Sequence, residues 1–146
     1  MYYPKGARPR AFKDRYNYDP VIDECSNELS KQDRIRLNGA IRLAMESRER
    51  TKHGCIIYQA GAVQGRGVNT KRNQPGIIQE IEALSIHAEI NALRRTSNLD
   101  GAVAYVSRVN SFGEPRCSRP CPDCMMALRL AGIKRVVYTI SGSEYL

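Results

Sequence analysis

Apolar residues recur at helical spacing in three segments of the chain. Residues 31–49 form the first segment, and there Ser30 and Asp33 have the spacing of a capping box at a helix start. A second helix is predicted from about Ile86 to the breaker at 96–98. A third begins near Pro122 and stops at Gly132, a residue that suits a C-terminal helix cap.

Short apolar runs predict strands between these helices. Residues 55–58 and 63–68 flank a Gln-Ala-Gly turn and predict a hairpin, followed by a polar loop over 66–75. Two more strands are predicted at 102–107 and 134–140, on either side of the third helix. Because strand–helix–strand crossovers are right-handed and parallel, these two strands should be parallel neighbours. The element order predicts a three-layer α/β/α sandwich with a mixed sheet of four to five strands.

The N-terminal segment, residues 1–29, shows no period of either kind. It is rich in Pro, Tyr, Lys and Arg, and we expect an extended arm that is ordered only where it docks. The remaining residues, 30–146, are then one compact domain, as the length of 146 residues favours. No apolar run approaches the roughly 20 residues of a membrane span, and no secretion signal is seen, so we expect a cytoplasmic protein without membrane contact.

The charge balance favours anionic partners. Lys and Arg number 23 and Asp and Glu 15, a formal net charge of +8, spread almost evenly along the chain. Phosphate recognition and an ordinary solvated surface both fit this pattern. Two basic loops could hold a phosphate if they rim one pocket, and their residues are Arg66, Lys71, Arg72, Arg108, Arg116 and Arg119.

Two short motifs carry metal chemistry. His87 opens the second predicted helix, and Cys121 and Cys124 open the third. An imidazole and two thiolates are a ligand set that Zn²⁺ accepts, with the fourth position left for water. Helix N-termini favour the thiolate over the thiol, so we expect the ion to lie between two helix starts.

Glu89 follows His87 by two positions, which turns its side chain about 200° around a helix. It should therefore not bind the same ion. A carboxylate near a metal-bound water, but not a ligand, can take a proton and return it to a leaving group. A rival arrangement adds Cys117 to the three ligands and closes the site as Cys₃His, with no open position and no purpose for Glu89.

The motif pair resembles the H-x-E…P-C-x-x-C signature of the zinc-dependent cytidine/deoxycytidylate deaminase superfamily. The resemblance covers about Ile35 to Tyr138 and leaves out the arm. Its matching segments are Ser47-Arg48, His53–Ile57, Gly67–Asn69, Ser85–Leu93, Ser118–Cys124 and Ala131–Tyr138.

The resemblance implies a role for several residues. His87, Cys121 and Cys124 would bind one Zn²⁺ and Glu89 would be the proton shuttle, which leaves Cys117 outside the ligand set. Asn69 would bind the substrate's sugar hydroxyl or base. The backbone N–H of Ala88 would face the base carbonyl, and the carbonyl of Arg119 the leaving amino group. Many members of the superfamily are homo-oligomers, which we also expect here.

We therefore expect a hydrolytic deaminase that converts a free cytosine nucleoside or nucleotide (cytidine, deoxycytidine or dCMP) into its uracil product. Residues 141–146 contain a Ser-Gly turn and predict a short antiparallel fifth strand, as in deaminases of free nucleosides. One alternative is a deaminase of bases in single-stranded DNA or RNA, in which the Tyr-rich arm stacks on bases. Another is a non-catalytic zinc module. His53 is expected to be structural or exposed, and Cys25 and Cys55 to be packing residues.

Overall fold

The computed structural model describes residues 22–24, 29–71 and 85–140. Its elements are β1 (Ile22–Glu24), α2 (Lys31–Ala44), β2 (Lys52–Gln59), β3 (Ala62–Val68), β4 (Thr70–Lys71), β5 (Ser85–Ile86), α3 (Ala88–Leu93), β6 (Val103–Val109), α4 (Pro122–Ala131) and β7 (Arg135–Tyr138). No helix in these ranges is long and apolar enough to cross a membrane.

Five of the described strands form one mixed sheet in the order β1-β7-β6-β2-β3. β2 is antiparallel to both β3 and β6, whereas β7 is parallel to β6 and to β1. The predicted parallel pair on either side of the third helix is thus confirmed. The short strands β4 and β5 form a separate antiparallel pair.

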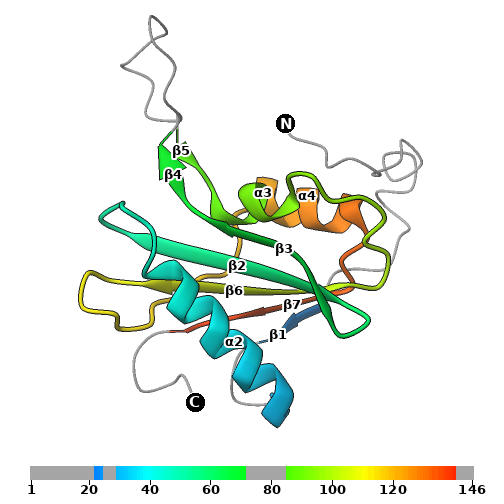
Figure 1. Cartoon of the computed structure of the whole chain (residues 1–146), viewed down its shortest axis with the longest axis horizontal. Coiled ribbons are helices and arrows are strands. Elements are labelled where there is room, and N and C mark those ends of the chain that lie inside the picture. Colours follow the sequence, from blue (N-terminus) through cyan, green and yellow to red (C-terminus); the bar gives the residue numbers. More distant parts are fainter. Residues whose placement is uncertain (1–21, 25–28, 72–84, 141–146) are drawn as a thin grey trace, which may run out of the picture.

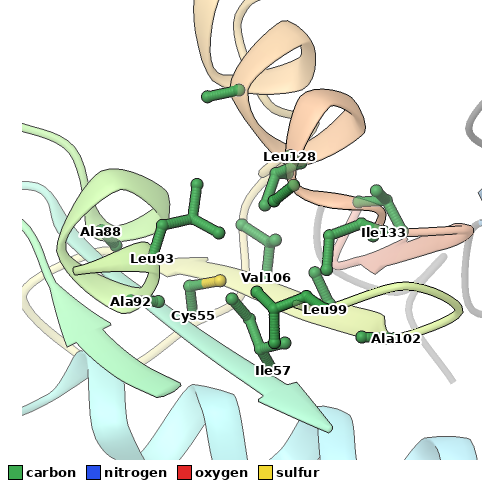
Figure 2. Close-up of a cluster of buried hydrophobic side chains, with 14 residues drawn as sticks. Cys55, Ile57, Ala88, Ala92, Leu93, Leu99, Ala102, Val106, Leu128 and Ile133 are labelled. Atoms are coloured by element: carbon green, nitrogen blue, oxygen red, sulfur yellow. The ribbon is translucent and has the colours of Figure 1, made fainter. Parts of the chain in front are cut away.

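Helices cover both faces of the sheet, which confirms the predicted three layers. In Figure 1, α2 crosses one face, and α3 and α4 lie side by side on the other. Leu37 and Leu43 of α2 pack on Ile56 and Tyr105 in one apolar cluster. The opposite cluster joins the sheet to α3 and α4, and Figure 2 shows Cys55, Ile57 and Val106 pointing from the strands toward those helices.

The first helix ends earlier than predicted, at Ala44 instead of residue 49. Its capping box is confirmed, since the backbone N–H of Asp33 donates to the Ser30 hydroxyl at 3.0 Å. Beyond Ala44, the buried Ser47 hydroxyl donates to the carbonyl of Asn69 at 3.1 Å, and the Lys52 ammonium donates to the carbonyl of Glu49 at 3.2 Å. The long-range bond from Ser47 and the local bond from Lys52 turn the chain toward β2, although its sequence would allow another helical turn.

Two other boundaries differ from the prediction. α3 begins at Ala88 because Ser85–Ile86 pairs with β4, and it ends at Leu93, just before the left-handed Arg95 (φ 64°). The loop predicted over 66–75 is wrong at its start. Residues 66–68 complete β3, and 70–71 form β4.

The sheet also includes part of the predicted N-terminal arm. Ile22–Glu24 pairs in parallel with Arg135–Val137, so these three residues form its edge strand beside β7. The rest of the arm, apart from residue 29, and the fifth strand predicted over 141–146 lie outside the described residues.

Glycines of β3 let α3 approach the sheet closely. A Cβ on Gly65 would lie 2.0 Å from the carbonyl oxygen of Ala92, and one on Gly67 would lie 2.6 Å from that of Ala88. No side chain fits at either position, so the helix rests on strand backbone. This contact fixes where the first turn of α3 lies over β3.

A buried carboxylate joins α2 to the sheet. Asp33 accepts a hydrogen bond from the Tyr105 hydroxyl at 2.7 Å and two from the Arg135 guanidinium. Burial alone would raise the pKa of Asp33, but the bonds from Arg135 and Tyr105 outweigh it and hold the pKa at about 2. The ionised form of Asp33 is thus favoured in the folded protein.

Gly67→Ala should destabilise the protein by about 3 kcal/mol, because the helix backbone must move to admit the methyl group. Gly39→Ala is the matched control. Its Cβ would meet only ordinary contacts, the nearest 3.8 Å away, and alanine is the better helix former, so stability should rise by roughly 0.5–1 kcal/mol. Urea unfolding measures both, and equal effects would contradict the close packing of α3.

The Asp33 network predicts acid sensitivity. The folded-state pKa lies below the usual value of 3.8, so the stabilisation is full above that pH and is lost as the pH falls toward 2. Between pH 5 and pH 3 the wild type should lose about 1 kcal/mol more unfolding free energy than Asp33→Asn. Urea unfolding at both pH values measures this difference, and equal losses would contradict it.

Candidate active site

Three side chains that could hold a metal ion meet where α3 and α4 begin. His87 precedes the first residue of α3, Cys121 precedes that of α4, and Cys124 lies in the first turn of α4. Their ligand atoms all lie within 4.8 Å of one another. The Nδ1 atom of His87 is 3.2 Å from the sulfur of Cys124 and 3.6 Å from that of Cys121.

The local sequence explains how α4 presents its two cysteines. Pro122 occupies the first turn, where its missing N–H costs nothing, and Gly132 ends the helix in the left-handed conformation (φ 104°). The helix therefore starts between the two sulfurs, with its free N–H groups and positive dipole end beside them.

The surroundings of Cys124 disfavour a thiolate until a cation is present. Burial, with smaller contributions from Glu89 and Cys121, raises the pKa of the Cys124 thiol. A divalent ion would offset these effects and favour the thiolates. One imidazole nitrogen and two sulfurs are a donor set that suits Zn²⁺ and leaves the fourth tetrahedral position open.

Glu89 lies deep beside this cluster without belonging to it. It is the second residue of α3, its exposure is 4%, and its carboxylate is not among the three grouped ligand atoms. Burial raises the pKa of Glu89, and its charge in turn raises the pKa of Cys55 and Cys124. The site therefore combines three ligands with one buried acid that can hold a proton.

The rival Cys₃His arrangement does not form. Cys117 is exposed, and among the described residues the ligand group contains His87, Cys121 and Cys124 only. Between Cys117 and Cys121, Ser118 is buried, and its hydroxyl lies 2.8 Å from that of Thr139. An ion held by His87, Cys121 and Cys124 would therefore have a fourth position that no further cysteine of the described residues fills.

Asn69 is held by backbone groups at the start of β2. Its amide oxygen accepts from the N–H of His53 at 2.9 Å, and its amide nitrogen donates to the carbonyl of Thr51 at 2.7 Å. An amide can form two further bonds, so this anchoring fixes its orientation and leaves capacity for a ligand. Of the other predicted contacts, Ala88 is buried in the first turn of α3, whereas Arg119 is exposed ahead of Cys121.

The structure places a histidine at the site that the sequence did not assign to it. His53 and Cys55 lie on the same face of β2, because side chains alternate along a strand, and Cys55 packs toward α3 and α4. Burial, followed by the charges of Arg108 and His87, lowers the pKa of His53 to about 4. His53 is therefore a half-buried, neutral group near a proposed metal ligand.

Of the six residues in the two predicted basic loops, the structure describes all but Arg72, and Arg66 does not face the site. Arg66 lies on the strand face opposite Gly65 and Gly67, away from α3. Arg116 pairs with Glu114 at 3.3 Å, and Arg72 lies outside the described residues. Of these cations, Arg108 lies on β6 directly opposite His53 of β2 in the strand register.

Comparison with known proteins identifies a family. The model of the cytidine and deoxycytidylate deaminase zinc-binding region matches residues 30–140. The deoxycytidylate deaminase of Enterobacteria phage T4 is 40% identical over 57 residues, which are 36% of this chain and 24% of that protein. The riboflavin biosynthesis protein RibD of Escherichia coli (strain K12) is 34% identical over 113 residues, 73% of this chain and 26% of RibD. The matches thus span about a quarter of these relatives.

A solved structure supports the fold. The dCMP deaminase of cyanophage S-TIM5, crystallised in apo form, aligns with a TM-score of 0.57 and 23% sequence identity. The alignment covers 77% of this chain and 86% of that protein. The two chains share the layered α/β architecture.

The ligand geometry predicts the metal content of variants. The wild type and Cys117→Ser should each purify with close to one zinc ion per chain, whereas Cys124→Ser should lose most of it. Glu89→Gln should keep its zinc, because its side chain is not a ligand. Elemental analysis measures the zinc content of all four proteins. A loss of metal in Cys117→Ser would contradict this ligand set and support the closed Cys₃His site instead.

Proposed function

The chain belongs to the cytidine and deoxycytidylate deaminase family, and from that premise we propose that it hydrolyses a free cytosine nucleoside or nucleotide to the uracil product and ammonia. The observation that carries the proposal is the buried acid beside an open metal site. Glu89 has no ligand role in the group of His87, Cys121 and Cys124, yet it lies beside that group. A structural zinc module has no use for such a carboxyl.

In this proposal His87, Cys121 and Cys124 hold Zn²⁺. When bound, the ion lowers the pKa of water in its open position toward ~7 and so supplies a nucleophile at neutral pH. The residues of the chain perform the proton transfers. Glu89 takes a proton from the attacking water and delivers it to the amino nitrogen as the C–N bond breaks. Its raised pKa lets the carboxyl hold that proton between the two steps.

The remaining contacts orient the base. The first-turn N–H of Ala88 has no partner within its own helix and would donate to the base carbonyl. The carbonyl of Arg119 would accept from the leaving amino group. Asn69 would use its remaining amide N–H and oxygen lone pair on the sugar or base. Assembly into a homo-oligomer stays a prediction.

Two phage relatives, among others that are riboflavin biosynthesis proteins, support a small cytosine substrate. The similar phage proteins from T2 and T4 are deoxycytidylate deaminases, each 40% identical to this chain over 57 residues. The single-stranded nucleic acid alternative depends on the arm, most of which lies outside the described residues. It predicts binding that weakens steeply with salt, whereas deamination of a free nucleotide needs no such binding.

The function is tested by ammonia release from cytidine, deoxycytidine, dCMP, adenosine, guanine and a single-stranded oligonucleotide. A free cytosine compound should be the preferred substrate. Glu89→Ala should lower kcat at least ~100-fold with zinc still bound, because only the proton carrier is lost. Full activity of Glu89→Ala would refute the mechanism, and preference for the oligonucleotide would favour the alternative.

A further inference from the structure

Three neighbouring strands present polar residues in one row beneath the metal site. Across the sheet, His53 of β2 lies opposite Arg108 of β6, and the N–H of His53 donates to the side chain of Asn69, which follows β3. Residues directly opposite in an antiparallel pair have Cβ atoms roughly 5 Å apart. We call Asn69, His53 and Arg108 the polar row.

Strand alternation places this row on the face that carries α3 and α4. Two positions away in the register, Cys55 lies opposite Val106, and Figure 2 shows both side chains pointing toward these helices. Two residues farther along each strand, His53 and Arg108 point to the same side. On the opposite face, the Ser107 hydroxyl donates to the carbonyl of Ala40 in α2.

Electrostatics agree with this placement. The charges of Arg108 and His87 both contribute to the lowered pKa of His53, after burial, so the guanidinium, the two imidazoles and the metal ligands share one region. His53 is neutral at physiological pH because that pKa is about 4. Arg108 is therefore the cation of the row.

The Arg108 side chain has no anionic partner in the part of the chain that the structure describes. Its backbone bonds to Thr139 and to Arg116, but the nearby Glu114 pairs with Arg116 instead. The residue is half-buried. A guanidinium held partly away from water is costly unless an anion pairs with it.

We propose that Arg108 binds the phosphate of the substrate, with His53 and Asn69 placed between that phosphate and the reacting base. The inference rests on the proposed function and narrows its substrate to a cytosine nucleoside monophosphate. A planar guanidinium binds phosphate through two parallel hydrogen bonds. One half-buried cation suits a single terminal phosphate, whereas a polynucleotide needs a groove of several exposed cations.

The test compares dCMP with deoxycytidine in the zinc-loaded enzyme. The wild type should have the higher kcat/KM for dCMP. Arg108→Met, which keeps the aliphatic bulk, should lower the ratio of the two kcat/KM values at least ~10-fold, mainly through a higher KM for dCMP. Arg108→Lys should restore part of the ratio because it retains a positive charge.

Arg66→Met is the matched control. The same chemical change is made on β3, in a residue that faces away from α3, and the ratio should stay at the wild-type value. An equal fall for both substrates in Arg108→Met would mean a structural role and would overturn the proposal. Deamination of the oligonucleotide in preference to dCMP would overturn it as well.

A second measurement separates this inference from the proposed function. Calorimetric titration with dUMP and deoxyuridine follows phosphate recognition without turnover. Tighter binding of dUMP by the wild type, lost in Arg108→Met, supports the phosphate contact even if ammonia release were absent and the proposed reaction failed. Equal binding of the two compounds, or none, overturns the phosphate contact while leaving deamination of a nucleoside open.

Discussion

The contact of α3 with the bare backbone of β3 is the constraint on which the site depends. Gly65 and Gly67 place no side chain between strand and helix. The helix α3 therefore lies closer to β3 than it could with any other residue at these two positions. On the opposite face of the same hairpin, a Cβ on Gly54 would lie 2.6 Å from the carbonyl oxygen of Ala40, so α2 approaches equally closely. The hairpin is thus fixed from both sides. The distance between the sheet and the start of α3, where His87 and Glu89 lie, is therefore fixed.

That fixed first turn gives two nearby residues opposite environments. The side chain of His87 is exposed, whereas that of Glu89, two positions later, is buried. His87 precedes α3 in an extended backbone conformation, whereas Glu89 belongs to the first turn of the helix, so the backbone changes conformation between the two residues. The exposed imidazole can reach a shared ion, and the buried carboxyl has a raised pKa. Ligand and proton carrier are therefore separated by geometry and burial, although both are side chains of one short segment.

Much of this architecture could be predicted from sequence, because the signals were local. The capping box at Ser30 and Asp33, the stop at Gly132 and the parallel strands around α4 follow from neighbouring residues. The end of α2 does not, since the buried bond from Ser47 to Asn69 joins distant segments. β1 gave no signal because an edge strand is held by backbone bonds, which need no side-chain pattern. His53 was missed because one histidine before a strand does not show which face it occupies. Only the register with Arg108 and the packing of Cys55 decide that.

The charges around the site fall into two groups, those of the candidate metal ligands and that of Arg108. A divalent ion held by His87, Cys121 and Cys124 would have its charge balanced by the two cysteine sulfurs once they bind as thiolates. His53 is neutral, because its pKa is about 4. Arg108 is then the positive charge of the polar row, its side chain has no anionic partner among the described residues, and it lies at the end of β6 and not on either helix that carries the candidate metal ligands. A change at this strand position alters the charge offered to a substrate while α3 and α4 keep their ligands in place. In the proposed function, the residues at the two helix starts would therefore carry the reaction, and those at the ends of β2, β3 and β6 would select the substrate.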